Sequence, residues 1–118
     1  MSERDKHLLL SIKDECEYIS EKIENRNLDD FIDDRDLKYI VVLALIKIGG
    51  YVKSLSEDLK QTYPGIRWIS ITNLRNVAAH NYDGLRMDDV WRNITRDVPE
   101  LLERVEEILL KERVEERG

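Results

Sequence analysis

The sequence predicts an all-α fold, an antiparallel bundle of four to five helices with up-down topology. Two observations lead to this prediction. Apolar residues recur three or four positions apart along almost the whole chain, which is helical spacing. Only five glycines and two prolines occur among 118 residues, whereas a β-sandwich or barrel needs more turn residues. A chain of this length corresponds to a single domain, which we place at residues 1–118.

The first half of the chain shows two helical stripes joined by a short turn. The first helix ends at Asn25–Asn27, because asparagine tolerates left-handed backbone and competes for backbone hydrogen bonds. A single turn is expected at Leu28–Ile32, and the second helix runs from an Asp33 or Asp34 N-cap to about Lys60. The stripes are Leu8, Ile12, Cys16, Ile19 and Ile23 in the first helix, and Leu37, Val41, Ala44, Ile48, Val52, Leu55 and Leu59 in the second.

The remaining elements are marked by glycine and proline. Gly49–Gly50 interrupts the second helix, and each mid-helix glycine costs about 1 kcal/mol relative to alanine, so we expect a close helix–helix approach or a kink there. After the turn at Pro64–Gly65, a third helix is predicted from about Ile66 to His80. A fourth begins near Met87–Asp88, and Pro99 should bend or split it because proline lacks a backbone donor.

Charge and composition limit the function classes. The formal net charge of −6 argues against a general nucleic-acid coat protein, which would need an excess of lysine and arginine. The stretch 66–96 is the exception, because it has five arginines against three acidic residues and is a candidate anion-binding region. Cys16 is the single cysteine, so no internal disulfide is expected, and no Cys/His cluster indicates a metal or another cofactor.

The chain also lacks the signals of export and membrane insertion. Its first ten residues are charged and contain no signal-peptide apolar stretch. The longest apolar run, Tyr39 to Ile46, is far shorter than the ~20 residues that span a bilayer. We therefore expect a cytoplasmic protein without a membrane partner.

The segment RNVAAHNY, residues 75–82, combines side chains suited to phosphate chemistry. His80 can act as a general acid or base near neutral pH, and Arg75 can hold a phosphate through two parallel hydrogen bonds. Tyr82 adds a phenolic hydroxyl. This set suits RNA transesterification, in which the 2′-hydroxyl attacks the adjacent phosphate and a cation stabilises the developing charge, with no metal demanded.

Helical geometry restricts how these residues can cooperate. Residues five apart lie roughly 140° apart around an ideal helix, so Arg75 and His80 would not share a face. Either the helix ends at His80, or the site is built from two copies of the chain. A histidine at a helix C-terminus is also a common cap, so spacing alone favours a structural role for His80 over a reaction centre.

The extended pattern resembles the signature of the HEPN superfamily, specifically the HepT-like (DUF86) toxins. That pattern is an arginine, four residues, a histidine, one residue and a tyrosine, followed by a glycine and a Val-Trp pair. The sequence DVPELLE from Asp97 and the layout upstream of Trp68 are similar to the family as well. The matching positions here are Arg75, His80, Tyr82, Gly84, Val90 and Trp91.

The resemblance implies an all-helical homodimer in which two Arg–His motifs form a metal-independent endoribonuclease cleft at the dimer interface. It further implies the toxin of a type VII toxin–antitoxin pair. Its partner would be an MntA-like minimal nucleotidyltransferase that neutralises the toxin by transferring AMP to Tyr82. One departure stands out: relatives often have Gly-Glu-Ala in the second helix, where this chain has Gly49–Gly50–Tyr51.

Several further residues have two interpretations. Arg67 and Arg86, with Arg92 and Arg96, could line an RNA path or belong to solvated helix faces. Asn76 and Asn81 could contact substrate or cap the helix. Trp68 and Trp91 could stack bases, although packing is favoured.

The departure at Gly50 and the acidic net charge leave a second function open. This is a catalytically weak HEPN dimer that binds RNA or nucleotide and acts with a nucleotidyltransferase. A purely structural helical dimer is the third alternative. The sequence does not select between tRNA and mRNA as the target.

Overall fold

The computed structural model describes the backbone of residues 1–80 and 82–117, and their side chains apart from those of Leu74, Val77, His80 and residues 114–117. These residues form helices and turns with no strand, so the predicted all-α class is confirmed. The helices are α1 (Glu3–Lys22), α2 (Leu28–Asp33), α3 (Arg35–Ser54), α4 (Glu57–Thr62), α5 (Trp68–His80), α6 (Met87–Arg92) and α7 (Val98–Arg117). A 3₁₀ turn (Tyr82–Gly84) follows α5, and a π-helical segment (Asn93–Asp97) joins α6 to α7.

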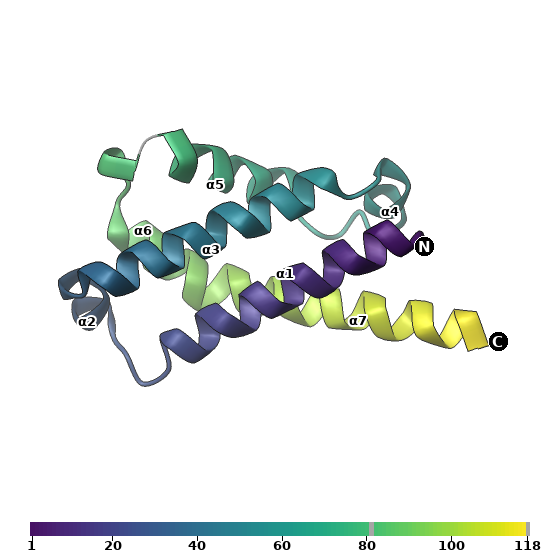
Figure 1. Ribbon diagram of the computed structural model, residues 1–118, viewed down its shortest axis with the longest axis horizontal. Coiled ribbons are helices and arrows are strands. Elements are labelled where there is room, and N and C mark those ends of the chain that lie inside the picture. Colours follow the sequence, from purple (N-terminus) through teal and green to yellow (C-terminus); the bar gives the residue numbers. More distant parts are fainter. Residues whose placement is uncertain (81, 118) are drawn as a thin grey trace.

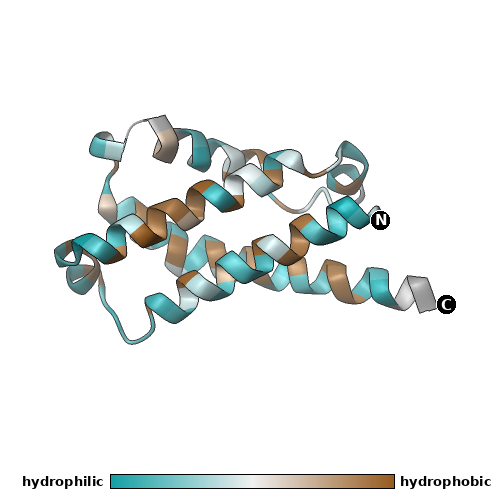
Figure 2. Cartoon of the chain, viewed as in Figure 1, coloured by the Kyte–Doolittle hydropathy of each residue, from teal (hydrophilic) through white to brown (hydrophobic). Residues whose placement is uncertain are grey.

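The long segments lie side by side and alternate in direction, as Figure 1 shows for α1, α3, α5 and α7. α1 packs on both α3 and α7, whereas α5 packs along α3. The core lies mainly between α1, α3 and α7, where the apolar stripes of these helices meet (Figure 2). It includes Leu9, Ile12, Cys16, Ile19, Val41, Ile48, Val52, Leu101, Val105 and Ile108, all at most 4% exposed. α5 is thus an outer layer supported by a single long helix.

The first connections follow the predicted signals. α1 ends at Lys22, and Asn25 adopts the left-handed conformation with φ 62°. The Asn27 side chain accepts from the N–H of Asp30 (2.8 Å) and caps α2. Asp34, one of the two predicted N-caps, caps α3 by accepting from the N–H of Leu37 (3.0 Å).

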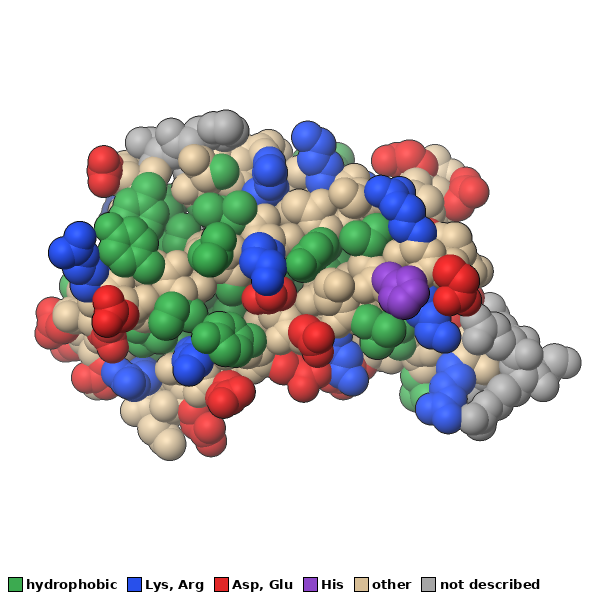
Figure 3. Space-filling view, in the orientation of Figure 1, with side chains coloured by type: hydrophobic (Ala, Val, Ile, Leu, Met, Phe, Trp, Pro, Cys, Tyr) green, Lys and Arg blue, Asp and Glu red, His purple; other side chains and the backbone are tan. Residues whose placement is uncertain are grey.

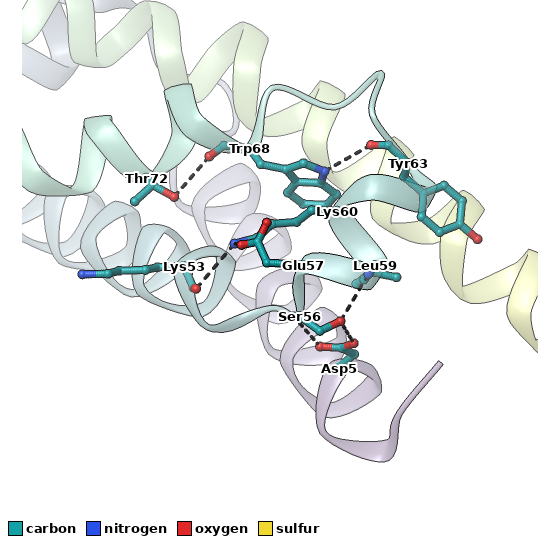
Figure 4. Close-up of polar contacts among 9 residues, drawn as sticks. All are labelled: Asp5, Lys53, Ser56, Glu57, Leu59, Lys60, Tyr63, Trp68 and Thr72. Atoms are coloured by element: carbon teal, nitrogen blue, oxygen red, sulfur yellow. Dashed lines mark hydrogen bonds and ion pairs between the residues drawn. The ribbon is translucent and has the colours of Figure 1, made fainter.

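The predicted end of the second helix at Lys60 is wrong. α3 ends at Ser54, and a separate helix, α4, begins at Glu57. Ser56 causes the break, since its Oγ accepts from the N–H of Leu59 (3.2 Å) and its own N–H and Oγ donate to Asp5 (3.0 and 2.6 Å), as Figure 4 shows. These hydrogen bonds with Leu59 and Asp5 stabilise a backbone conformation at Ser56 that a continuous helix would not allow.

The expectations for Gly49–Gly50 and Pro99 are met in different ways. α3 continues through the glycine pair, and the pair serves close packing against α5. The fourth helix is interrupted where expected: α6 ends at Arg92, and the π-helical segment leads into α7, whose second residue is Pro99. Proline has no N–H to bond the carbonyl four residues earlier. This explains why the hydrogen bonding just before Pro99 is not that of a regular α-helix, which begins again at Val98.

Candidate functional site

The site predicted from the RNVAAHNY segment lies at the C-terminal end of α5. The start of this helix is fixed by Trp68, whose indole Nε1 donates to the carbonyl of Tyr63 (3.1 Å) and whose side chain is 7% exposed (Figure 4). The helix ends at His80. This is one of the two alternatives by which Arg75 and His80 could cooperate, the other being a site built from two copies of the chain. The side chain of His80 and the whole of Asn81 lie outside the described residues.

Arg75 lies on the face of α5 that packs against the glycine pair of α3. An ideal Cβ built on Gly49 would lie 2.1 Å from the Arg75 Cβ and 3.2 Å from the carbonyl oxygen of Ile71, so only glycine fits there. The Arg75 Nη1 donates to the Oδ1 of Asn76 (3.2 Å). The Arg75 Nε is buried and has no hydrogen-bond acceptor among the described residues. The contacts with α3 are therefore made by the aliphatic part of the Arg75 side chain. Its guanidinium forms no ion pair with a carboxylate of the described residues.

Tyr82 is held by a second contact with α3. Its ring stacks on the ring of Tyr39, with centroids 5.3 Å apart and planes 6° apart, and the Arg35 guanidinium lies 5.7 Å from the Tyr39 centroid. Burial raises the pKa of the Tyr82 phenol, Tyr39 and Asp83 raise it further, and Arg35 opposes them. Tyr82 is therefore neutral at physiological pH, and it would need a base in order to act as a nucleophile.

Arg67 and Arg86 do not join Arg75 in one cluster of free cations. Arg67 pairs with Asp97 (3.7 Å) and Glu100 (3.8 Å). It precedes α5, and thirteen residues of helical rise place it roughly 20 Å along the axis from His80. Arg86 pairs with Asp88 (3.1 Å) and Asp89 (3.9 Å). Both side chains are highly exposed, so these ion pairs are weak and exchangeable.

The tryptophans and the cysteine have packing roles in the described structure. Trp68 is buried, and Trp91 is partly buried with its ring 5.4 Å from that of Phe31. Burial raises the pKa of the Cys16 thiol to about 12, with Glu15 and Glu17 adding to the effect, so this thiol stays protonated. The packing interpretation of all three residues is confirmed.

Two features were not predicted from the sequence, a stack of side chains on Tyr82 and a cavity at the first half of α5. Arg35 and Tyr39 form a partly exposed stack with Tyr82, and Tyr39 is 50% exposed. Their spacing of four residues on one helix was a signal that could have found them. Hydrophobic side chains gather at the upper left of the surface shown in Figure 3. A cavity of about 320 Å³ lies between the first half of α5 and the α6–α7 junction, lined by Ile66, Arg67, Ile71, Asn73, Asn93 and Asp97 among others. No sequence motif marks this cavity.

No group of three or more His, Cys, Asp or Glu side chains able to hold a metal ion occurs among the side chains that the structure describes. Within the same part of the chain, every helix is too short or too polar to cross a bilayer.

Comparison with known proteins gives a consistent result. Residues 12–108 match the family described as ribonuclease HepT-like. A protein of Caldanaerobacter subterraneus subsp. tengcongensis is 32% identical over 102 residues, which cover 86% of this chain and 91% of that protein. A protein of Methanocaldococcus jannaschii is 29% identical over 107 residues, 90% of this chain and 98% of that protein, and both are named "Putative RNase".

A third relative carries the family name itself. The "Probable ribonuclease HepT" of Thermococcus cleftensis is 28% identical over 108 residues, 92% of this chain and 98% of that protein. No solved structure matches the chain. The family model covers most of the chain, including the whole segment from Arg75 to Trp91. The chain belongs to the ribonuclease HepT-like family.

Proposed function

We propose that this protein is a metal-independent endoribonuclease that cuts RNA through Arg75 and His80. The observation that carries the proposal is the placement of Arg75. The stem of its side chain packs against α3, its Nε has no acceptor among the described residues, and it precedes by five residues a histidine that ends the helix. A phosphate-binding cation and a histidine that acts as acid or base, brought together in one site, suit reaction at a phosphate.

In the proposed reaction, the RNA 2′-hydroxyl loses its proton to a base and its oxygen bonds to the adjacent phosphorus. The bond from phosphorus to the 5′-oxygen breaks, and that oxygen takes up a proton. His80 acts as the acid or the base, and Arg75 stabilises the charge on the phosphoryl oxygens. Asn76, Asn81, Arg67 and Arg86 would contact the RNA, with the carboxylate partners of the two arginines giving way to phosphates.

The homodimer is part of the proposal. Residues five apart lie roughly 140° apart around an ideal helix, so we propose that a second copy of the chain brings the Arg75 of one protomer to the His80 of the other. The same reasoning explains how a chain of net charge −6 can bind RNA, because two net-positive 66–96 segments would line one cleft.

The proposed biological role is that of a toxin in a type VII toxin–antitoxin pair. An MntA-like nucleotidyltransferase would transfer AMP from ATP to Tyr82: the phenolic oxygen attacks the α-phosphorus, pyrophosphate leaves, and the phenolic proton passes to a base. Because Tyr82 is two residues from His80, the added phosphodiester would repel RNA phosphate and obstruct the cleft.

The direct test is RNA cleavage in EDTA, using total tRNA and an mRNA as substrates. The intact mass of the protein should first show that Tyr82 carries no adduct. We expect the wild type to cut RNA and the His80→Ala variant, with its helical circular dichroism retained, to leave it intact. Wild-type protein that leaves every RNA class uncut would contradict the proposal.

The second candidate function is a catalytically weak dimer that binds RNA or nucleotide and acts with its nucleotidyltransferase. It is favoured by the carboxylate partners of Arg67, Arg86 and Arg92, which reduce the positive charge available to a substrate. RNA or nucleotide binding by unmodified wild type without product formation would select this function.

A further inference from the structure

The tyrosine of the motif has an arginine close to it that the proposed reaction does not use. The Tyr82 ring lies nearly parallel to that of Tyr39, with centroids 5.3 Å apart, and the guanidinium carbon of Arg35 lies 5.7 Å from the Tyr39 centroid. Arg35 and Tyr39 come from the first turns of α3, and Tyr82 opens the 3₁₀ turn that follows α5. A cation and two phenols from distant segments therefore gather two residues past His80.

Arg35 is a cation without a carboxylate partner. Unlike Arg67 and Arg86, it forms no ion pair with a carboxylate of the described residues, and its side chain is exposed. The neighbouring Asp34 is engaged elsewhere, because it caps α3 and pairs with Arg26 (3.5 Å). An exposed guanidinium of this kind keeps its donors for a ligand, and its planar fork matches the oxygens of a phosphate.

The two phenols complete a set of hydrogen-bond donors. Hydrogen bonding to Tyr39 raises the pKa of the Arg35 guanidinium, and Tyr82 is among the nearby groups whose charge adds to the effect. A hydroxyl that accepts from a guanidinium still has its own proton to donate. Burial raises the pKa of the Tyr82 phenol, so this hydroxyl also remains a donor at neutral pH. Arginine and tyrosine side chains are regular partners of nucleic-acid phosphates.

This group of donors lies along the same helix as the arginine of the motif. An ideal Cβ on Gly50 would fall 3.6 Å from the Arg75 Nε, and Tyr39 precedes that glycine by eleven residues, roughly 16 Å along the helix axis. His80 ends α5 between these two points of the sequence. A strand of RNA that reaches Arg75 and His80 can therefore place another of its phosphates at Arg35, a few nucleotides from the one that reacts.

We propose that Arg35, together with the hydroxyls of Tyr39 and Tyr82, forms a second phosphate-binding site, which holds the backbone of single-stranded RNA next to the reaction centre. The site increases affinity for the strand and makes no contact with the reacting atoms. This inference rests on the proposed ribonuclease function for the identity of its ligand, and the contacts among the three side chains carry its structural part.

The salt dependence of binding tests this site without catalysis. The probe is a single-stranded 2′-O-methyl oligouridine, which has phosphates but lacks the attacking 2′-hydroxyl. Each phosphate that a protein neutralises on a single strand contributes about −0.7 to the slope of log binding constant against log salt concentration. We expect Arg35→Gln to flatten this slope by about 0.7 and to weaken binding at low salt on the order of fivefold.

Matched variants separate a local contact from a general effect of charge. Arg104→Gln makes the same charge change on α7, where Arg104 pairs with Glu107 (3.5 Å), and it should keep the wild-type slope. Arg35→Lys keeps the charge and should keep most of the slope. Tyr39→Phe keeps the ring but loses a hydroxyl, so binding should weaken on the order of twofold with the slope unchanged. Circular dichroism of each variant checks that its helices are intact.

Three results of the binding experiment would overturn the site. The first is a wild type that does not bind the oligouridine at low salt. The second is a wild-type slope in Arg35→Gln, which would show that this side chain neutralises no phosphate. The third is equal flattening by Arg35→Gln and Arg104→Gln, which would reduce the effect to net charge.

Cleavage in EDTA gives the second readout. A contact away from the reacting atoms holds substrate and transition state equally, so Arg35→Gln should raise KM and leave kcat close to wild type. A lower kcat at unchanged KM would contradict a binding role. A wild type that shows the Arg35-dependent slope but cuts no RNA would refute the proposed function and leave the site standing. Cleavage by a wild type whose slope Arg35→Gln does not change would refute the site and leave the function standing.

Discussion

Arg75 and Tyr82 are both positioned by residues on one face of α3. Arg75 packs on Gly49 and Gly50, and Tyr82 stacks on Tyr39. Tyr39 and Gly50 are eleven residues apart, which is three helical turns, so they lie on the same face. A single straight helix therefore fixes the arginine and the tyrosine of the motif relative to each other.

The Tyr39–Tyr82 stack should contribute measurably to stability. Tyr39→Phe keeps the ring contact, whereas Tyr39→Ala removes it. Aromatic pairs contribute about 0.5–1.5 kcal/mol beyond their buried area, so we expect the Ala variant to be less stable than the Phe variant by at least that amount in urea denaturation. Equal stability of the two variants would show that the stack does not hold Tyr82.

Asp5 is a buried carboxylate, 3% exposed, that ties the start of α1 to the α3–α4 junction. Burial raises the pKa of Asp5, but hydrogen bonds from Ser56 and Ser2 outweigh it and bring the pKa below its usual value. A carboxyl with a lowered folded pKa contributes stability above its unfolded pKa, and this is lost as the pH falls through the folded pKa.

We therefore expect Asp5→Asn to lower the free energy of unfolding by about 1–3 kcal/mol at pH 7, because an amide cannot accept both Ser56 donors. The difference from wild type should shrink as the pH falls from the unfolded pKa of about 3.9 through the lower folded pKa, where the wild-type carboxyl becomes protonated. Urea denaturation at neutral and at acidic pH measures this. Asp14→Asn, an exposed position on the same helix, is the control. A pH-independent difference would contradict the account.

At the scale of elements, the junction between α1 and α2 depends on Asn25. Its φ of 62° lies in the left-handed region, which costs most L-residues roughly 1–2 kcal/mol. We expect Asn25→Ala to destabilise the protein by about 1 kcal/mol and Asn25→Gly to leave its stability close to wild type. Thermal denaturation of the two variants gives the comparison, and equal destabilisation by both would contradict this explanation.

Local signals predicted most element boundaries, and long-range contacts explain the errors. Asp34 and Asn25 act within a few residues of their own position, so the sequence was sufficient to place the ends they define. The break at Ser56 was missed because Leu55 and Leu59 continue the apolar stripe across it, and both are indeed buried. The contact that stabilises the break comes from Asp5, 51 residues away, which periodicity cannot reveal.

The candidate site shows the same division between local signals, which the sequence reveals, and long-range contacts, which it does not. The motif residues and the end of α5 at His80 follow from a contiguous stretch of sequence. The close approach at Gly49–Gly50 was expected, but not that its partner would be Arg75. The stack of Arg35 and Tyr39 with Tyr82 joins segments more than forty residues apart, and its exposure depends on how α5 lies on α3.

At the scale of the whole molecule, the question is whether one site uses two chains. We expect sedimentation to give twice the chain mass of 14.0 kDa. Mixing inactive Arg75→Ala and His80→Ala protomers should restore up to about a quarter of wild-type cleavage if subunits exchange at random. Half of the dimers are then mixed, and each has one intact site made from the Arg75 of one chain and the His80 of the other. No recovery despite confirmed exchange would place both residues of a site in one chain.

The measurement that tests the central claim most directly compares two RNAs that differ by one oxygen. One has a ribose at the mapped cut site, and the other has a 2′-deoxyribose there. The account predicts that, in EDTA, the wild type cuts the first RNA to give a 2′,3′-cyclic phosphate and a 5′-hydroxyl end. It should leave the second RNA uncut at that position, and His80→Ala should cut neither. Cleavage of the deoxy substrate, or equal cleavage by His80→Ala, would contradict a centre in which His80 and Arg75 promote attack by the 2′-hydroxyl.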